Sequence, residues 1–173
     1  MPPFAATRPV NPPGASPVIS EQQLWAGLGI KIREPKEFVP VITECRVVLD
    51  EDGKVVRIVR FEDGPEMREE VSTFEPTMAY FEMYPASSHP AGTSPSSPSS
   101  APVPPPVARI TNLISYGPPP ANDLLLTFTF SKLPQVSEED AVKMSREELN
   151  AMVGKGVEGS IEVVRRMVKE GKL

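Results

Sequence analysis

The sequence predicts an α+β fold in which a long C-terminal helix lies across a curved antiparallel sheet of six or seven strands. Between positions 42 and 131, six short strand-like segments are joined mostly by short, turn-like connections, which is typical of hairpins. The last part of the chain, Ser137 to Gly171, has apolar residues at helical spacings of three and four, and predicts one long helix or a short helix running into a long one. Strands and helices do not alternate, so the pattern excludes a doubly wound nucleotide-binding fold.

The first elements are a strand and two short helices. Phe4 to Val10 predicts the strand, which stops at the turn sequence Asn11-Pro12-Pro13-Gly14. Ser20 and the glutamine three residues later are spaced as a capping box, which marks a helix start. Pro35 ends this helix or begins a second one. Four apolar residues fall on one side of the first helix: Leu24, Trp25, Leu28 and Ile32.

Six further strands follow the helices. They are expected at Ile42 to Asp50, Lys54 to Phe61, Glu66 to Phe74, Met78 to Tyr84, Val107 to Tyr116 and Asp123 to Ser131. Residues typical of turns lie at the ends of these segments, as in Glu51-Asp52-Gly53 between the first two. Segments that are neighbours in the sequence are therefore expected to pair as antiparallel hairpins.

Length and composition indicate one globular domain, residues 1–173. Of the 173 residues, 39% are hydrophobic and 24% charged, which is enough for a proper core. The net charge of -5 argues against a nucleic-acid partner, because phosphate binding needs a basic surface. No apolar run approaches the ~20 residues that cross a bilayer, and the N-terminus does not resemble a signal peptide. Cys45 is the only cysteine, so we expect a reduced, cytoplasmic protein, as a monomer or homodimer.

Pro85 to Pro106 is rich in serine and contains eight of the 22 prolines. Low-complexity sequence of this kind cannot form a packed core. Because it lies between two predicted strands, we expect a disordered insertion within the domain. His89, the only histidine, falls inside it, so neither a catalytic triad nor a zinc site is expected.

Glycines interrupt the predicted C-terminal helix. Gly154, Gly156 and Gly159 lie near Ser160, and each glycine inside a helix costs about 1 kcal/mol relative to alanine. Small residues there let a strand, a second helix or a ligand come close, and we expect a hollow beneath them. The glycines also match a dinucleotide fingerprint, but that motif works only between a strand and a helix. We therefore expect no nucleotide and no other cofactor.

Charged residues interrupt two neighbouring predicted strands. Arg57 and Arg60 lie in one and Glu69 and Glu70 in the next, so an Arg and a Glu can pair across the ladder. In each strand, the odd-numbered and the even-numbered residues are both partly apolar. The pattern therefore does not decide which of the two sets points into the core. Glu70 and Phe74 point to the same face of their strand, and Phe74 is an expected core residue. This favours Arg60 with Glu70 as a cavity-facing catalytic pair. A surface pair without further function is the alternative.

Other residues are candidates for contacting a ligand. Asn112 lies among apolar residues, where a buried carboxamide needs a hydrogen-bond partner and could orient a ligand carbonyl or satisfy a bulge. Tyr80 offers a hydroxyl group, and Trp25 either packs the helix on the sheet or lines the cavity. The full set of candidates is Trp25, Tyr80, Asn112, Phe128, Gly156 and Ser160.

Several short motifs occur in a shared order along the chain. They are Val10 to Pro13, Leu24 to Leu28, Phe38 to Cys45, Val59 to Phe61, Arg68 to Val71 and Leu126 to Phe130, followed by the C-terminal helix. In this order they resemble the helix-grip fold of the START/SRPBCC superfamily, and specifically its small AtaL-like family, a group of unknown function common in fungi. The resemblance covers nearly the whole chain outside the Ser/Pro-rich segment.

This resemblance implies a deep cavity for an apolar or aromatic small molecule, but it supplies no catalytic residue set. The superfamily includes carriers, cyclases, dehydratases and isomerases of polyketide-like and plant metabolites. One hypothesis is an enzyme of secondary metabolism that catalyses a cofactor-free cyclisation, dehydration or isomerisation. In it, Arg60, Asn112 or a tyrosine polarises a carbonyl while Glu70 moves a proton. The other hypothesis is a carrier that binds an apolar metabolite without chemistry.

Overall fold

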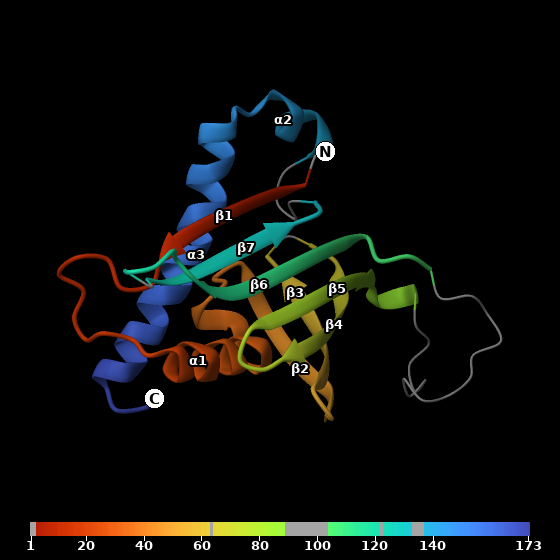
Figure 1. The fold of residues 1–173 in the computed structure, drawn as a ribbon. Coiled ribbons are helices and arrows are strands. Elements are labelled where there is room, and N and C mark those ends of the chain that lie inside the picture. Colours follow the sequence, from red (N-terminus) through yellow and green to blue (C-terminus); the bar gives the residue numbers. More distant parts are fainter. Residues whose placement is uncertain (1–2, 63, 89–103, 122, 133–136) are drawn as a thin grey trace.

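The computed structural model describes residues 3–62, 64–88, 104–121, 123–132 and 137–173. Over these residues the chain forms a seven-stranded antiparallel sheet and a long C-terminal helix, as predicted (Figure 1). Most of the predicted Ser/Pro-rich insertion, including His89, lies outside the described residues.

The sheet is a meander closed at one edge by the first strand. Its spatial order is β1-β7-β6-β5-β4-β3-β2, and all neighbours are antiparallel. Asp52 and Gly53, between β2 and β3, have φ angles of 48° and 75°, the left-handed conformations that a tight hairpin turn requires. The strands are β1 (Phe4–Pro9), β2 (Ile42–Glu51), β3 (Lys54–Phe61), β4 (Glu66–Phe74), β5 (Met78–Pro85), β6 (Ala108–Tyr116) and β7 (Leu124–Phe130).

The helices begin at the caps that their sequences provide. α1 (Glu21–Arg33) starts at the predicted capping box of Ser20 and leads into the 3-10 helix η1 (Pro35–Glu37). The 3-10 turn η2 (Ala86–Ser88) follows β5. The C-terminal segment is a short helix, α2 (Glu138–Lys143), followed by a long one, α3 (Arg146–Lys169). Ser145 caps α3 with an extended backbone, which explains the break between them. Within the described residues, no helix has the length and apolarity to cross a membrane.

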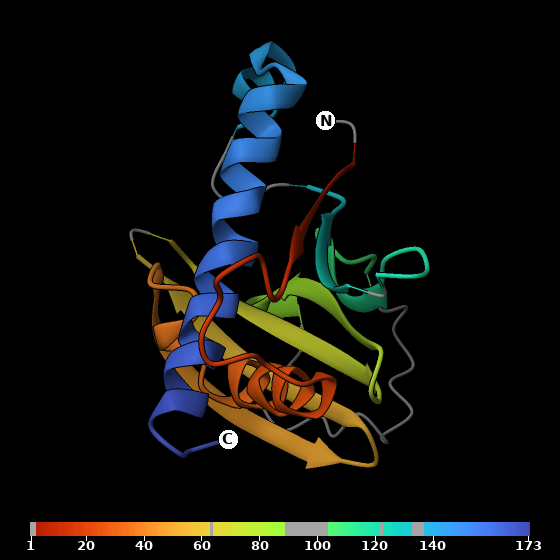
Figure 2. The same ribbon diagram turned by 60° about the vertical axis from the view of Figure 1, so that its left-hand side comes forward.

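α3 crosses the sheet and packs against β1, β7 and α1, while α1 packs against β2 and β3 (Figure 2). Two glycines permit these close approaches. A Cβ atom at Gly27 of α1 would collide with Val164 of α3, and one at Gly154 of α3 would collide with the Arg8 guanidinium of β1. The small residues therefore allow helix-to-helix and helix-to-strand contact.

The core is divided into two apolar clusters. The larger is built from β1, β7, α1 and α3 around residues such as Leu126, Val157 and Val164. The smaller contains Ile32 at the end of α1 and side chains of β3, β4 and β5. Phe74 belongs to neither: it is 54% exposed, so the prediction that it is a core residue is wrong. Because side chains alternate along β4, Phe74 lies at the end of this strand on the face opposite α1 and α3.

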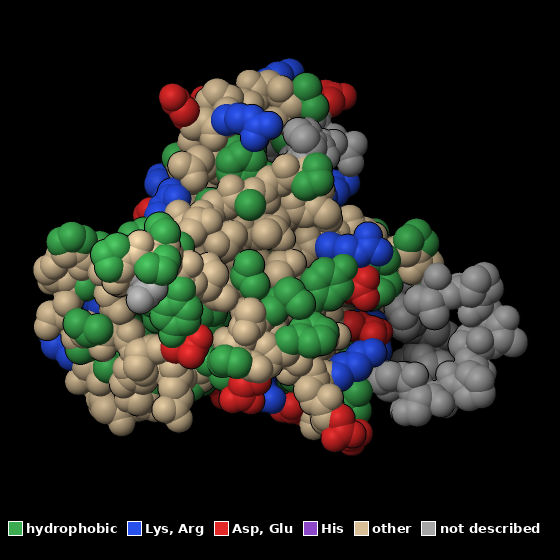
Figure 3. All heavy atoms as spheres, viewed as in Figure 1, with side chains coloured by type: hydrophobic (Ala, Val, Ile, Leu, Met, Phe, Trp, Pro, Cys, Tyr) green, Lys and Arg blue, Asp and Glu red, His purple; other side chains and the backbone are tan. Residues whose placement is uncertain are grey.

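The surface carries both signs of charge. On the face shown in Figure 3, Lys and Arg side chains are interspersed with Asp and Glu, and hydrophobic side chains lie between them. The acidic residues that give the chain its negative net charge thus do not form one continuous patch on this face.

Candidate functional site

A pocket of about 320 Å³ lies between the sheet and α3, beside the C-terminal end of α1. It occupies the space between the two apolar clusters. Its walls come from α1, the segment joining η1 to β2, the six strands β2 to β7 and α3, and they are mostly apolar. The larger apolar residues on the walls include Phe38, Phe61, Phe81, Phe128, Phe130 and Met152.

Five polar side chains interrupt the apolar walls of this pocket. They are Lys31, Arg57, Glu69, Asn112 and Ser160, and none is more than 7% exposed. Burial of a polar group is costly unless the group is hydrogen-bonded, so their partners determine what each can do.

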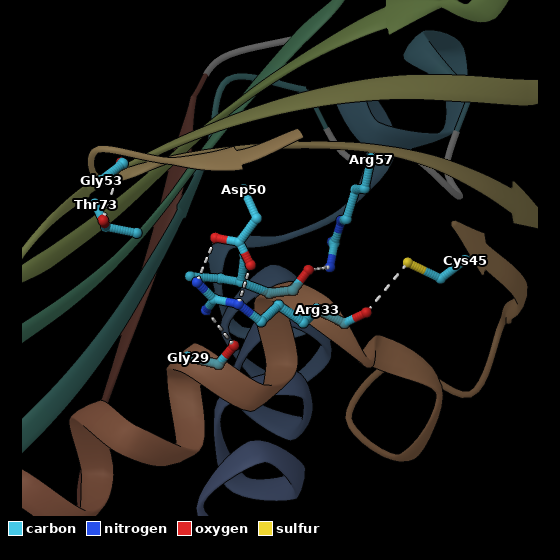
Figure 4. Close-up of polar contacts among 8 residues, drawn as sticks. Gly29, Arg33, Cys45, Asp50, Gly53, Arg57 and Thr73 are labelled. Carbon is cyan, nitrogen blue, oxygen red and sulfur yellow. Dashed lines mark hydrogen bonds and ion pairs between the residues drawn. The ribbon is translucent and has the colours of Figure 1, made fainter. Parts of the chain in front are cut away.

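Arg57 and Glu69 form a buried ion pair directly across β3 and β4. Arg57 Nε lies 2.6 Å from Glu69 Oε2, and its Nη1 donates to the carbonyl oxygens of Lys31, at 2.9 Å, and Ile32. Figure 4 shows Arg57 reaching from β3 toward the end of α1. These carbonyls belong to the last turn of α1 and have no partner within the helix. Arg57 therefore fastens α1 to the sheet and has little capacity left for a ligand.

Lys31 contacts β6 and β7 instead. Its Nζ donates to Asn112 Oδ1 at 2.9 Å and lies 3.7 Å from the centroid of the Phe128 ring. Asn112 and Phe128 are direct neighbours in the β6–β7 register. Among the described residues, no acceptor is bonded to Asn112 Nδ2. A buried amide donor on the pocket wall is thus available to a ligand oxygen.

The protonation of Lys31 follows from its surroundings. Burial, and secondly the positive charge of Arg57, lower the pKa of Lys31 to about 7, although Glu69 opposes the shift. At neutral pH a large fraction of the side chain is therefore the neutral amine, which is both a base and a nucleophile.

Exposed contacts hold the same end of α1 to β2. Arg33 binds Asp50 through two hydrogen bonds of 2.7 Å, and Cys45 Sγ donates to the Arg33 carbonyl oxygen at 3.5 Å (Figure 4). Burial raises the pKa of the Cys45 thiol, so it is not a thiolate nucleophile. These contacts orient α1, and with it Lys31.

Four of the residues proposed from the sequence lie on the pocket wall: Asn112, Phe128, Gly156 and Ser160. The Ser160 hydroxyl donates to the Gly156 carbonyl oxygen at 2.9 Å, and a Cβ atom at Gly156 would meet nothing within 4 Å. Trp25 and Tyr80 lie elsewhere. Trp25 is half-buried against the larger cluster, and Tyr80 lies on the opposite face of the sheet from Phe81.

The prediction that Arg60 and Glu70 form the cavity-facing pair is wrong. Arg60 lies opposite Glu66, with Nη2 2.8 Å from Oε1, on the outer face of the sheet. Glu70 binds Lys54 and Arg68; burial opposes ionisation of its carboxyl, but these hydrogen bonds outweigh it and lower its pKa. Side chains alternate between the two faces of a sheet along each strand. Arg60 and Glu70 belong to the alternating set that points outward, and the inward pair is Arg57 with Glu69.

The sequence reasoning missed Lys31. A signal was present, because Leu24, Leu28 and Lys31 follow one another at spacings of four and three, which places Lys31 on the buried side of α1. Lysine is rarely buried unless it is paired, and this made an exposed position the simpler expectation. Its partner Asn112 is 81 positions away, which no local pattern reveals.

Solved structures of similar fold have low sequence identity to this chain. An uncharacterised protein from Bacillus thuringiensis has a TM-score of 0.54 at 16% identity, over 94% of this chain and 98% of the other. The protein XoxI from Bacillus cereus has a TM-score of 0.54 at 17% identity, over 95% and 96%. The di-domain ARO/CYC protein StfQ of the steffimycin biosynthetic pathway has a TM-score of 0.56 at 11% identity, over 98% of this chain and 51% of StfQ. This chain thus spans about half the length of StfQ.

Comparison with curated proteins gives no match. A family model does match: the one described as acetylaranotin biosynthesis cluster protein L, or AtaL, covers residues 4–171. The match runs from the first residue of β1 to just beyond the end of α3, and therefore includes every element that surrounds the pocket. It confirms the resemblance seen in the sequence motifs, and the helix-grip arrangement of the sheet and α3 agrees with it. The chain belongs to the AtaL family.

Proposed function

We propose that this protein binds an aromatic, polyketide-like molecule in the pocket between the sheet and α3. There it catalyses a cofactor-free step of secondary metabolism: a cyclisation, a dehydration or an isomerisation. The observation that carries the proposal is the buried Lys31 amine on an apolar pocket wall, hydrogen-bonded to Asn112 Oδ1, while Asn112 Nδ2 has no acceptor among the described residues. The family name, which refers to a biosynthesis cluster, and the fold shared with an aromatase/cyclase-type protein support it.

The pocket suits an aromatic ligand in size and lining. Its volume of about 320 Å³ is within the range of small-molecule sites, roughly 300–1,000 Å³. Phe81, Phe128 and Phe130 offer ring surfaces for stacking, and the polar groups stand on a limited part of the wall. A flat, partly oxygenated molecule meets both requirements.

Proton transfer at a carbon next to a carbonyl is the chemistry these groups support. The neutral Lys31 amine removes the proton, and Asn112 Nδ2 donates a hydrogen bond to the carbonyl oxygen, where negative charge develops. The resulting enolate attacks a second carbonyl in a ring closure, expels a β-hydroxyl group in a dehydration, or takes a proton elsewhere in an isomerisation. General base catalysis of this kind contributes about 10²–10⁴-fold in rate.

A carrier is the second candidate, and the pairing of Arg57 with Glu69 favours it. Because each of these charges already has a partner, Lys31 and Asn112 are the main polar contacts that the described part of the wall offers a ligand. A mostly apolar pocket with one or two polar anchors is sufficient for binding alone.

The test uses 2-acetonaphthone, an aromatic methyl ketone, as the probe. We expect it to bind, and in D2O we expect the protein to accelerate deuterium exchange of its methyl protons, followed by NMR. Lys31→Met should keep binding within a few-fold and lose about 10²-fold of the exchange rate. Lys155→Met, a change at an exposed lysine of α3, is the matched control and should exchange like the wild type.

Binding without accelerated exchange would establish the carrier and overturn the enzyme. Failure of the probe to bind would overturn the ligand pocket itself. Native mass spectrometry of the protein from its own source then identifies the molecule that occupies the pocket.

A further inference from the structure

We propose that Lys31 captures carbonyl compounds covalently: its side-chain nitrogen forms an imine with an aldehyde or ketone group of the molecule bound in the pocket. The inference rests on the proposed function in one respect, since the same pocket must admit an aromatic carbonyl compound. It goes further by making Lys31 a nucleophile as well as a base.

The geometry singles out Lys31 among the groups on the wall. Its Nζ is held on one side by Asn112 Oδ1 and on another by the Phe128 ring, and it lines the pocket. Arg57, the other cation there, is bonded to Glu69 and to two backbone carbonyls. A guanidinium also stays protonated in proteins, so it cannot attack a carbonyl carbon.

The charged groups that face Lys31 are Arg57 of β3 and Glu69 of β4. Among the described residues, the side chains that β5, β6, β7 and α3 contribute to the walls are uncharged. Burial, reinforced by Arg57, therefore prevails over Glu69 and brings the pKa of Lys31 to about 7. A solvated lysine has a pKa of about 10.4, so at pH 7 Lys31 carries on the order of 10³ times more neutral amine.

The step balances without any other reagent. The Lys31 nitrogen lone pair forms a bond to the carbonyl carbon while the C=O π pair moves to oxygen. Both amine protons then leave with that oxygen as water, and a C=N double bond remains. Asn112 Nδ2 is placed beside the amine to hydrogen-bond the oxygen as charge develops on it. The protonated imine withdraws electrons from the adjacent carbon, which eases the proton removal that the proposed function needs.

A purely structural lysine does not account for this position. Methionine would fill similar apolar space without the cost of desolvating an amine. Because a buried lysine shifts its pKa readily, enzymes use such lysines as general bases and as Schiff-base residues. The placement of an amine here, in contact with Phe128 and 7% exposed, is therefore what imine chemistry requires.

The experiment is reductive trapping with 2-naphthaldehyde and sodium cyanoborohydride, read by intact mass and by peptide mapping. At pH 7 we expect one adduct per chain, with the mass of the aldehyde less one oxygen. It should lie on Lys31 and form at least about 10²-fold faster than the mean of the exposed lysines, in line with its larger amine fraction. The labelling rate should rise with pH to a half-maximum near pH 7.

Three variants separate the chemistry from the fold. Lys31→Arg keeps a long basic side chain but has no amine that can attack a carbonyl, so it should lose the adduct, whereas Lys155→Arg should label like the wild type. Asn112→Asp places a carboxylate beside Nζ and favours the ammonium form, so its labelling midpoint should move upward and its labelling should recover near pH 9. A Lys31 that forms no imine would give no adduct at any pH, and therefore no labelling midpoint in either the wild type or the variant.

Slow labelling spread over the exposed lysines, with Lys31 unmodified while 2-acetonaphthone still binds, would overturn the imine and leave the proposed function standing. If neither naphthyl compound binds, the proposed function fails and the inference fails with it.

Discussion

Two arginine–glutamate pairs join β3 to β4, and they lie on opposite faces of the sheet. Arg57 and Glu69 point inward, and their side chains are each 4% exposed. Arg60 and Glu66, on the same two strands, point outward and are 48% and 46% exposed. Both pairs thus join an arginine of β3 to the glutamate directly opposite it on β4, and they differ in how deeply the side chains are buried.

The comparison shows how burial changes the role of a charge. The outer pair stays in water, where an ion pair contributes little because solvent screens it. The inner pair has lost its water, so Arg57 needs two backbone carbonyls in addition to Glu69. The same dry surroundings lower the pKa of Lys31 to about 7, and this gives the inner face an amine that is partly neutral near pH 7.

The largest expected effect is on stability. Arg57→Met leaves Glu69 as an unpaired buried charge and should lower the free energy of unfolding by about 3–5 kcal/mol. Urea denaturation measures it. Arg57→Met with Glu69→Met removes both charges and should recover part of the loss. Arg60→Met is the matched outer control, and a cost equal to that of Arg57→Met would contradict the importance of burial.

The second prediction concerns pH. The folded-state pKa of Lys31 is about 7, below its ordinary value near 10.4, so between these pH values the unfolded chain binds more protons. Stability contributed by this group therefore rises with pH. From pH 7 to 9 the unfolding free energy should rise by roughly 2 kcal/mol more for the wild type than for Lys31→Met. Denaturation at both pH values checks it, and a difference that stays constant or falls would contradict the burial of the amine.

The third prediction compares two glycines of α3. Gly156 lines the pocket and Gly159 does not, and a Cβ atom at either would meet nothing within 4 Å. Gly156→Leu should fill the pocket and weaken the binding of 2-acetonaphthone at least about tenfold, or 1.4 kcal/mol. Gly159→Leu should bind the ketone like the wild type in the same titration. Equal affinity of both variants would place the ligand elsewhere.

The smallest effect is expected at the outer pair. Glu66→Gln removes one of the two carboxylates beside Arg60 in a solvated position and leaves Glu44, 3.6 Å from Arg60 Nε, so the thermal midpoint should change by little more than its error. That small difference should vanish at high salt, at about 1 M, where the screening length falls to about 3 Å. A large, salt-independent loss would show that the outer pair is as important as the inner one.

Much of the fold could be predicted from local patterns. β3 and β4 occupy the predicted residues, Lys54–Phe61 and Glu66–Phe74, because turn residues bound each run. The capping box at Ser20 marked the start of α1 correctly. Asn112 and Gly156 were placed near a hollow because a polar residue among apolar neighbours and a glycine within a helix each need a reason. Strand bounds, helix caps and unusual residue types are local features, so the neighbouring residues in the sequence are enough to predict them.

The face of each strand was decided only by the tertiary structure. β3 is partly apolar on both sides, so its own residues do not say whether Arg57 or Arg60 points inward. α1 and α3 settle this by covering one face, and their contacts with the sheet are long-range. Lys31 depends on the same packing: its low pKa arises from burial and secondly from the positive charge of Arg57, and its contacts with Asn112 and Phe128 are likewise with residues distant in the sequence. The sequence by itself determined the elements and their order, and the packing of the helices determined which charges lost their water.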